Sequence, residues 1–387
     1  MSRRFIFLLL AALVLTLFWR SMPSEHEAPS FSPTKSIATI SSKPRYSSQF
    51  VSHGETPRVH SVTAVAITDA VVRSFWYGGT REGAQDVAIY ASEFDAKAVV
   101  WSKPEMLVDR SAAQRDLHRY IRKLGNPVIY RPSDTELWLF YVSVSVGGWA
   151  GSSINLMISN DLGTSWQATK RLVTSPFFNI STLVKGPGFK YRDGTVGLPV
   201  YHEFIGKFGE LLRLDEDGNL LDKIRLSSGD NSLQPVIIPM DDLRASGFMR
   251  YAGEFPRRVL NFHSNDGGAS WSSPAKSALP NPNAAVSVIK LVGGELLMAF
   301  NNSEDGREDL TLAVSKNQGR DWQVAAALEQ GVSDSESREH EYSYPWLLQS
   351  PDGTIHLLYT WNKERIRHVL FNRAWLDGQI TADGVAS

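Results

Sequence analysis

The sequence contains no cysteine among its 387 residues. Disulfide bonds, thiolate metal sites, cysteine nucleophiles and a lipid-modified cysteine are therefore excluded. The chain also lacks a charge excess, since 40 Lys and Arg residues balance 41 Asp and Glu residues. Proteins that bind nucleic acid usually carry a basic excess, so we expect no nucleic-acid partner. We also expect no metal and no cofactor, because the His residues are scattered and the acidic residues gather in turns.

The residues that are abundant favour a β-rich protein with many turns. The chain has 29 Gly, 19 Pro and 11 Trp, and 42% of its residues are hydrophobic. This composition allows a large core made of short strands.

An uncharged apolar run, Phe5 to Trp19, lies near the start, with Arg3 and Arg4 before it and Arg20 after it. The run is short for a membrane span. A span is still possible, because the terminal Trp suits the membrane interface and the following Arg can extend its charge to that interface. We interpret residues 1–20 as an uncleaved anchor, because no A-x-A-like cleavage site follows the run. A cleaved secretory signal is the alternative. The basic amino end would then stay in the cytoplasm while the rest is exported.

Three further segments follow in the predicted domain organisation. Residues 21–57 are rich in Ser, Pro, Lys and Glu and are predicted to form a flexible linker. Residues 58–378 are assigned to one globular domain, and residues 379–387 to a C-terminal tail.

A turn motif, S-x-D-x-G-x-[ST]-W, occurs in full at Ser159–Trp166 and Ser264–Trp271. A degraded copy at Ser315–Trp322 keeps its Gly and Trp but has Asn317 and Asp321 at the other positions. An Asp or Asn at the head of such a turn accepts hydrogen bonds from following amides, and Gly takes the positive φ. The motif is structural and performs no chemistry.

The domain also repeats a longer unit, in which two strand-like runs flank a polar turn. The six turns centre near Asp69, Asp134, Asp193, Asp242, Gly293 and Asp352. Their spacing of roughly 50 to 65 residues fits a four-stranded blade. The sequence therefore predicts an all-β, six-bladed β-propeller.

In a propeller the innermost strands converge, so residues at one end of the hairpins are expected to share a central pocket. The polar residues at these hairpin ends suit a sugar-binding pocket. They are His60, Arg81, Asp86, Asn126, Ser143, His202, Glu203, Gln234, Arg250, Asn283, Asn301, Asn302, Arg307, Tyr342, Trp361 and Lys363.

With these motifs the chain resembles the sialidase (neuraminidase) superfamily that carries Asp-box (BNR) repeats, over roughly Arg58 to Val369. The resemblance implies a cradle of three arginines for the carboxylate of a 2-keto sugar acid. Arg250 and Arg307 match the second and third arginines, and a planar guanidinium suits a carboxylate because it donates two parallel hydrogen bonds.

The resemblance also implies a tyrosine nucleophile, a carboxylate that activates it and an aspartate acid/base. Tyr342, in Glu341-Tyr342-Ser343-Tyr344-Pro345, is similar to the nucleophile motif, with Tyr344 as the competing candidate one register away. Asp86 is the candidate acid/base, with Glu82 as its competitor.

Two positions depart from the family pattern. The first arginine is not clearly present, because His60 stands at its place and Arg58 lies two residues earlier. Gln234 stands where the activating carboxylate is expected and cannot act as a base, so Glu203 or Glu341 would have to supply that charge.

The leading hypothesis is a retaining exo-glycosidase that removes a terminal α-linked 2-keto sugar acid. Sialic acid is the family's usual substrate. The apolar N-terminal run and the substituted slots are also similar to the Kdo hydrolases, which trim lipopolysaccharide precursors at the bacterial inner membrane from the periplasmic side. The sequence leaves open whether the protein has a membrane partner subunit.

Two alternatives remain. One is a non-catalytic Asp-box propeller that binds glycan or assists envelope assembly. The other is a polysaccharide lyase that uses His202 with Tyr342.

Overall fold

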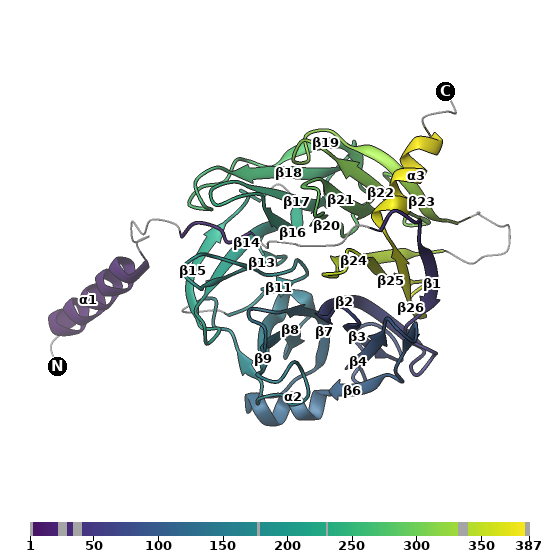
Figure 1. Ribbon diagram of the computed structural model, residues 1–387. Coiled ribbons are helices and arrows are strands. Elements are labelled where there is room, and N and C mark those ends of the chain that lie inside the picture. Colours follow the sequence, from purple (N-terminus) through teal and green to yellow (C-terminus); the bar gives the residue numbers. More distant parts are fainter. Residues whose placement is uncertain are drawn as a thin grey trace.

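Six antiparallel sheets of four or five strands are arranged around a central axis (Figure 1). The computed structural model describes residues 3–21, 29–33, 41–175, 179–229, 231–331 and 340–383. Each innermost strand contacts the innermost strands of the two neighbouring sheets, and β2 of the first sheet contacts β24 of the last, which closes the ring. The predicted all-β six-bladed propeller is confirmed.

The first three blades follow one another in sequence. The first contains β2 (Arg58–Thr68), β3 (Val71–Gly79), β4 (Ala88–Asp95), β5 (Val100–Trp101) and β6 (Glu105–Val108). The second contains β7 (Lys123–Tyr130), β8 (Leu137–Val144), β9 (Ser152–Ser159) and β10 (Lys170–Arg171), and α2 (Arg110–Leu117) precedes it. The third contains β11 (Leu183–Val184), β12 (Phe189–Lys190), β13 (Val196–His202), β14 (Phe208–Leu214) and β15 (Leu220–Arg225).

The last three blades complete the ring, and the sixth takes its outer strand from the N-terminal part of the chain. The fourth contains β16 (Ser232–Pro239), β17 (Ala245–Tyr251), β18 (Arg258–Ser264) and β19 (Ala275–Pro280). The fifth contains β20 (Ser287–Lys290), β21 (Leu296–Phe300), β22 (Asp309–Ser315) and β23 (Gln323–Gln330). The sixth contains β24 (Tyr342–Gln349), β25 (Ile355–Trp361), β26 (Arg365–Phe371) and β1 (Tyr46–Phe50).

Strand β1 joins the two ends of the domain, because it pairs antiparallel with β26 from Tyr46 opposite Phe371 to Phe50 opposite Arg367. Part of the segment 21–57, which the sequence assigns to a flexible linker, is thus built into the sixth sheet. The sequence of this short strand, YSSQF, gives no sign of its distant partner. The remaining helix, α3 (Arg373–Asp383), follows β26 and covers most of the expected C-terminal tail, whereas 384–387 lie outside the described residues.

The hairpin turns lie where the repeat predicts them, between the first and second long strands of each blade. They occupy one end of the ring, which we call the turn face. The three S-x-D-x-G-x-[ST]-W turns lie on the same face, because they follow the third strand. In the first copy, Asp161 accepts from the Ser165 amide at 2.8 Å, and in the degraded copy Asn317 accepts from the Asp321 amide at 2.9 Å. An Asn oxygen therefore replaces the carboxylate without loss of the turn.

A second N-terminal segment, 29–33, is fixed to the turn face. The Phe31 side chain is fully buried, stacks on Tyr191 with a centroid distance of 5.5 Å and meets Trp271 edge-on at 6.4 Å. Its amide donates to the Asp242 carbonyl at 2.7 Å. The Trp of the second turn motif therefore forms part of a socket for a residue more than 200 positions away.

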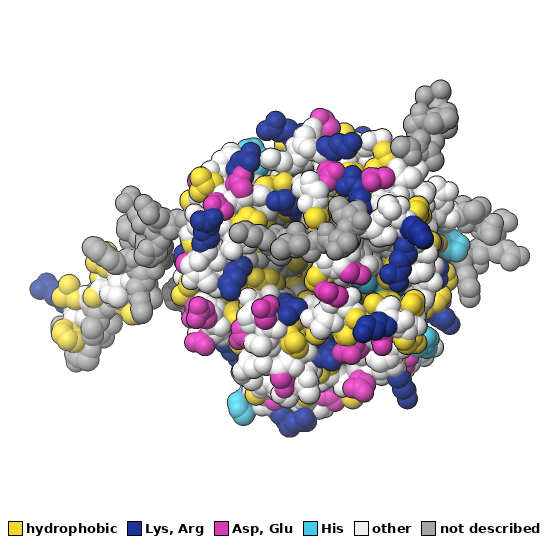
Figure 2. Space-filling view, viewed as in Figure 1, with side chains coloured by type: hydrophobic (Ala, Val, Ile, Leu, Met, Phe, Trp, Pro, Cys, Tyr) yellow, Lys and Arg dark blue, Asp and Glu magenta, His cyan; other side chains and the backbone are white. Residues whose placement is uncertain are grey.

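The apolar N-terminal run forms α1 (Arg3–Ser21), shown apart from the propeller in Figure 1. Within the described residues, no helix combines the length and apolar character that crossing a membrane requires. The span expected over residues 1–20 is therefore not shown. On the propeller, Figure 2 shows acidic and basic side chains intermixed over the visible face, as the balanced composition predicts.

We predict that Phe31→Ala lowers the free energy of unfolding by about 3 kcal/mol, because it empties a fully buried aromatic site. Urea unfolding followed by tryptophan fluorescence measures the change. Phe5→Ala is the matched control, since Phe5 is exposed in α1 and its loss should leave the midpoint unchanged. Equal midpoints for Phe31→Ala and the wild type would contradict the socket.

We also predict that acid destabilises the fold through two buried histidines between the sixth and first blades. His356 Nδ1 lies 3.0 Å from His368 Nε2, and Trp101 Nε1 donates to His368 Nδ1 at 3.2 Å. Burial lowers the pKa of His356 from 6.5 to about 4, and lowers the pKa of His368 further. The unfolded chain takes up these protons below pH 6.5 while the folded chain does not, so stability is full above pH 6.5 and falls towards pH 4.

Each histidine should remove about 1.4 kcal/mol per pH unit in this range. Urea midpoints at pH 7.5, 6 and 5 measure the effect. Midpoints that stay constant across the series would show that the pair is not held neutral.

Candidate functional site

Each blade has a residue with a left-handed backbone on or just before its innermost strand. One from each blade gives the set Ser61, Asn126, Ser181, Gln234, Asn283 and Tyr344, with φ between 39° and 58°, and the fourth blade has a second such residue, Asn231. In four blades the strand pairing shifts at this residue, for example between Leu233 and Val236 and between Ser343 and Trp346. A non-glycine residue in this conformation costs about 1–2 kcal/mol, so its repetition indicates a required geometry.

These residues and their neighbours form a hydrogen-bonded central network. Gln234 Nε2 donates to the Tyr344 hydroxyl at 3.2 Å and to the Tyr201 hydroxyl at 3.3 Å. Asn126 Nδ2 also donates to the Tyr201 hydroxyl, at 3.2 Å. Since Gln234 donates to it, the Tyr344 oxygen acts as an acceptor here.

Arg250 and Arg307 converge on Asn283 from neighbouring blades. Arg250 Nε donates to the Asn283 side-chain oxygen at 2.5 Å, and Arg307 Nη2 donates to its backbone carbonyl at 2.8 Å. Arg250 Nη1 also donates to Gln234 Oε1 at 3.3 Å, which fixes the amide so that its NH₂ group faces the tyrosines. Each guanidinium has five N–H groups, so both retain donors for an anion.

Glu341 balances part of this positive charge. Its carboxylate lies 3.2 Å from Arg307 Nη1 and 2.5 Å from Lys363 Nζ. Burial acts to raise the pKa of Glu341, but the hydrogen bond from Lys363 and the charges around it hold the pKa below its usual value. Glu341 is therefore an ionised counterion for Arg307, whereas Arg250 has no carboxylate partner within the described residues.

His60 lies beside Tyr344, with ring centroids 4.4 Å apart, and its Nδ1 is 3.1 Å from the Thr360 hydroxyl. Only 6% of its surface is exposed. Burial lowers its pKa to about 3, although Glu341 opposes the shift. At neutral pH, His60 is uncharged and does not supply the positive charge of an arginine.

A cavity of about 630 Å³ opens beside this network, at the end of the ring opposite the turn face. We call it the central pocket. It shares His60 and Glu341 with the network. Its other lining residues are Arg58, Val59, Tyr77, Gly79, Arg81, Glu82, Val87, Asn362, Lys363 and Glu364. The volume and the mixed polar lining suit a small polar ligand.

Glu203 follows β13, and its amide donates to the Ser181 hydroxyl at 2.9 Å. Burial raises the pKa of its carboxyl, while the positive charge of Arg250 opposes the shift. Glu203 therefore keeps its proton to a higher pH than an exposed glutamate. A half-buried carboxyl beside an arginine is suited to proton transfer.

The family model of the BNR repeat-like domain matches residues 71–357, which is most of the propeller. This chain belongs to the BNR repeat-like family. The match bears out the Asp-box (BNR) resemblance that the sequence indicated. No curated protein matches the sequence.

Solved structures of similar fold include sialidases. Hadza microbial sialidase Hz136 aligns with a TM-score of 0.66 and 16% identity, over 83% of this chain and 67% of that chain. Trypanosoma rangeli sialidase aligns with a TM-score of 0.65 and 13% identity, over 88% of this chain and 61% of that one. A Dyadobacter fermentans protein of unknown function aligns with a TM-score of 0.67 and 13% identity, over 84% and 97%. At these identities the likeness shows the fold.

Tyr342, the sequence-based candidate for the nucleophile, does not face the central network of this BNR repeat-like propeller. Its ring is 4% exposed and packs in a hydrophobic cluster between the fifth and sixth blades, 6.4 Å from Tyr359. The shift in strand pairing after Ser343 turns Tyr344 inward instead. The tyrosine that belongs to the site geometry is therefore the one treated as the competing candidate.

Asp86, the sequence-based candidate for the acid/base, is exposed and does not line the central pocket. It accepts hydrogen bonds from the amide of Thr80, at 2.9 Å, and from the Thr80 hydroxyl. These bonds lower the pKa of Asp86, so its carboxyl is ionised. The carboxylate stabilises the loop between Thr80 and Asp86. Glu82, the competitor, does line the pocket.

The other predicted residues divide into two groups. Gln234, Arg250, Arg307 and His60 meet in the network as the repeat implied, and Arg81 lines the pocket. Asn302 lies outside, because it is exposed and its amide donates to Asp309.

The sequence did contain a signal for Tyr344. Asn126, Gln234 and Tyr344 are each followed by proline, at Pro127, Pro235 and Pro345. Proline has no N–H and suits a bulge where the ladder is interrupted. In three blades the residue before such a proline, at the bulge of the innermost strand, is the one that faces the central network. Tyr201 and Lys185 carried no comparable signal.

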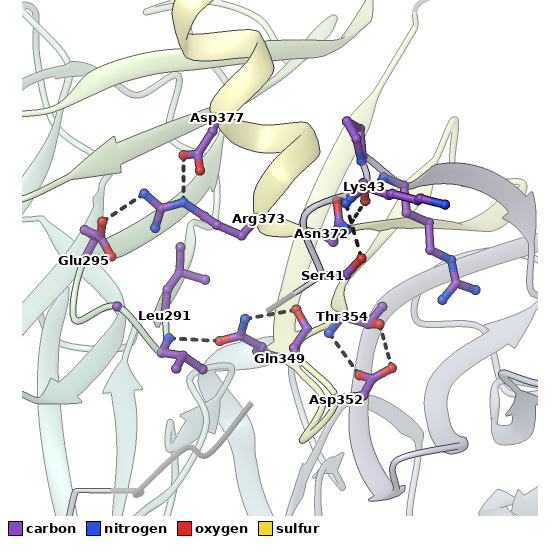
Figure 3. A pocket seen from close by; sticks show the side chains of 15 residues that line it. Ser41, Lys43, Leu291, Glu295, Gln349, Asp352, Thr354, Asn372, Arg373 and Asp377 are labelled. Atoms are coloured by element: carbon purple, nitrogen blue, oxygen red, sulfur yellow. Dashed lines mark hydrogen bonds and ion pairs between the residues drawn. The ribbon is translucent and has the colours of Figure 1, made fainter. Parts of the chain in front are cut away.

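A second cavity, of about 550 Å³, lies on the turn face between α3 and the segment Ser41–Arg45 (Figure 3). Its acidic groups already have partners. Arg373 binds both Glu295, at 2.9 Å, and Asp377, at 2.7 Å, and Asp352 accepts from Thr354. Arg373 in this cavity is thus already bound to two carboxylates, and the other cations of its lining are Lys43 and Arg45.

We predict that Arg250→Met weakens binding of a monosaccharide carboxylate such as free sialic acid by about 10- to 100-fold, because a charge-assisted hydrogen bond contributes about 1.5–3 kcal/mol. Isothermal titration calorimetry measures the affinity. Arg244→Met is the matched control, since Arg244 pairs with Asp241 in a turn-face hairpin and should not matter. Equal affinities for Arg250→Met and the wild type would exclude this arginine from the carboxylate site.

Proposed function

We propose that this protein is a retaining exo-glycosidase that removes a terminal 2-keto sugar acid from a glycan. The observation that carries the proposal is the arrangement of Arg250, Arg307 and Tyr344, joined through Asn283 and Gln234. Two guanidinium groups with unused donors can hold the carboxylate of the sugar. A phenol linked to the same network can then reach the adjacent anomeric carbon.

Tyr344 is the nucleophile in this proposal. Its oxygen forms a bond to the anomeric carbon as the glycosidic C–O bond breaks, and the leaving oxygen receives a proton from a carboxyl group. Water then attacks the tyrosyl glycoside, which releases the sugar with its original configuration and restores the phenol. A neutral phenol suffers less repulsion from the sugar carboxylate than a carboxylate nucleophile would.

We assign these proton transfers to two carboxyl groups. Glu82 lies in the lining of the pocket, where the leaving part of the glycan would emerge, and we assign it the donation to the leaving oxygen. Glu203 lies beside Arg250 with a raised pKa, and we assign it the acceptance of the phenol proton. Gln234 orients Tyr344 but transfers no proton.

A second candidate function is glycan binding without hydrolysis. Two observations favour it: Gln234 contacts the phenol where a carboxylate could have acted as a base, and His60 is neutral. The same arginines would bind the same sugar acid under both proposals. The two therefore differ only in turnover.

The test uses sialyl-lactose and Kdo₂-lipid A, because the pocket is proposed to recognise the feature that their sugars share, a carboxylate on the anomeric carbon. Chromatography measures release of the free sugar acid. We expect the wild type to release it from one of these substrates, and Tyr344→Phe to lower kcat by about 10³-fold or more.

Tyr342→Phe is the matched control. The Tyr342 hydroxyl has no hydrogen-bond partner among the described residues and its ring packs in the core, so this variant should keep wild-type kcat. Loss of turnover in Tyr342→Phe but not in Tyr344→Phe would overturn the assignment. Binding of the sugar acid without release by the wild type would favour the second candidate.

A further inference from the structure

Lys185 lies directly after β11 of the third blade, and only 3% of its surface is exposed. Its Nζ donates to the Pro345 carbonyl at 3.2 Å. The same nitrogen lies 4.9 Å from the Trp346 ring centroid and 5.7 Å from that of Tyr344. Residues 344–346 belong to β24 of the sixth blade, and the third and sixth blades face each other across a six-bladed ring. Lys185 therefore reaches across the centre of the ring, from the third blade to the sixth.

This lysine has an unusual set of partners. Within the described residues it forms no ion pair, and its contacts are a backbone carbonyl and two aromatic faces. Burying an ammonium group without a carboxylate is costly, and burial lowers the pKa of Lys185 from 10.5 to about 7. A methionine or leucine would fill the same space without this cost. The amine is therefore expected to contribute something that packing does not require.

The hydrogen bond falls on the bulge that presents Tyr344. Strand pairing is interrupted between Ser343 and Trp346, so Tyr344 and Pro345 lie outside the regular ladder. Tyr344 has a φ of 53°, which is strained for an aromatic residue. A donor from the opposite blade holds the next carbonyl and Gln234 holds the phenol, so this short segment is restricted at two points.

We propose that Lys185 is a positioning residue, whose hydrogen bond to Pro345 keeps the Tyr344 bulge in the conformation that directs the phenol into the central network. Its role in turnover rests on the proposed function, but its role in holding Tyr344 does not. Lys185 itself touches no reacting atom. Its loss should therefore impair the reaction of bound sugar more than its binding.

The kinetic test compares Lys185→Met with Lys185→Gln. Methionine keeps the packing against Tyr344 and Trp346 but removes the donor, so we expect kcat to fall about 10- to 100-fold with KM within about twofold of the wild type. Glutamine restores a neutral donor and should recover most of kcat. Wild-type kcat in Lys185→Met, or an equal loss in both variants, would overturn the proposal.

A second measurement is independent of any activity. Tyrosine labelled with ¹³C at Cζ gives one resonance per residue, and the Tyr344 signal is the one missing from Tyr344→Phe. We expect this signal to move in Lys185→Met, because the phenol leaves its bond to Gln234, and to return to the wild-type position in Lys185→Gln. An unchanged signal in Lys185→Met would overturn the proposal even if the protein hydrolyses no sugar.

Thermal unfolding of both variants separates local from global effects. If Lys185→Met does not yield folded protein, the comparison of Lys185→Gln with the wild type remains decisive. The proposal then requires the same Tyr344 resonance in both, and a displaced resonance in Lys185→Gln would contradict it. Absence of sugar release by the wild type, with the expected ¹³C shifts present, would reject the glycosidase and leave the positioning role intact.

Discussion

The site depends on a backbone constraint that recurs around the ring. Each innermost strand has a residue with positive φ on it or near it, a conformation that is unfavourable by about 1–2 kcal/mol for residues such as Gln234 and Tyr344. The central network offsets this cost, since Asn126, Gln234, Asn283 and Tyr344 are all hydrogen-bonded within it. Backbone geometry and site chemistry therefore stabilise each other.

The network gives the central pocket an uneven distribution of charge. Glu341 pairs with both Arg307 and Lys363, whereas Arg250 lies near Glu203, whose pKa is raised by burial. The uncharged His60 and Gln234 stand at positions where a more strongly charged site could have carried an arginine and a carboxylate. An anionic ligand is thus expected to depend mainly on Arg250, and its reaction on the orientation of Tyr344.

The sequence predicted the architecture well because the repeat is dense in local signals. Six hairpin turns and three Asp-box turns determine the blades through short-range hydrogen bonds, which residue types reveal directly. Gln234, Arg250 and Arg307 were found because the repeat places them. Tyr342 was preferred to Tyr344 because its segment resembles the family's nucleophile motif, and the resemblance does not reveal the bulge after Ser343 that turns Tyr344 inward. The partners of Phe31 and of β1 are far apart in sequence, and nothing local identifies them.

The central claim is that Tyr344 attacks the anomeric carbon of a bound sugar acid. Mass spectrometry after incubation with a fluorinated 2-keto sugar acid, which slows hydrolysis of the glycosyl-enzyme, tests this most directly. The account predicts one covalent sugar per chain, located on Tyr344 by fragmentation of its peptide and absent from Tyr344→Phe. An adduct on Tyr342 or on a carboxylate, or no adduct on a protein that releases the sugar, would contradict it.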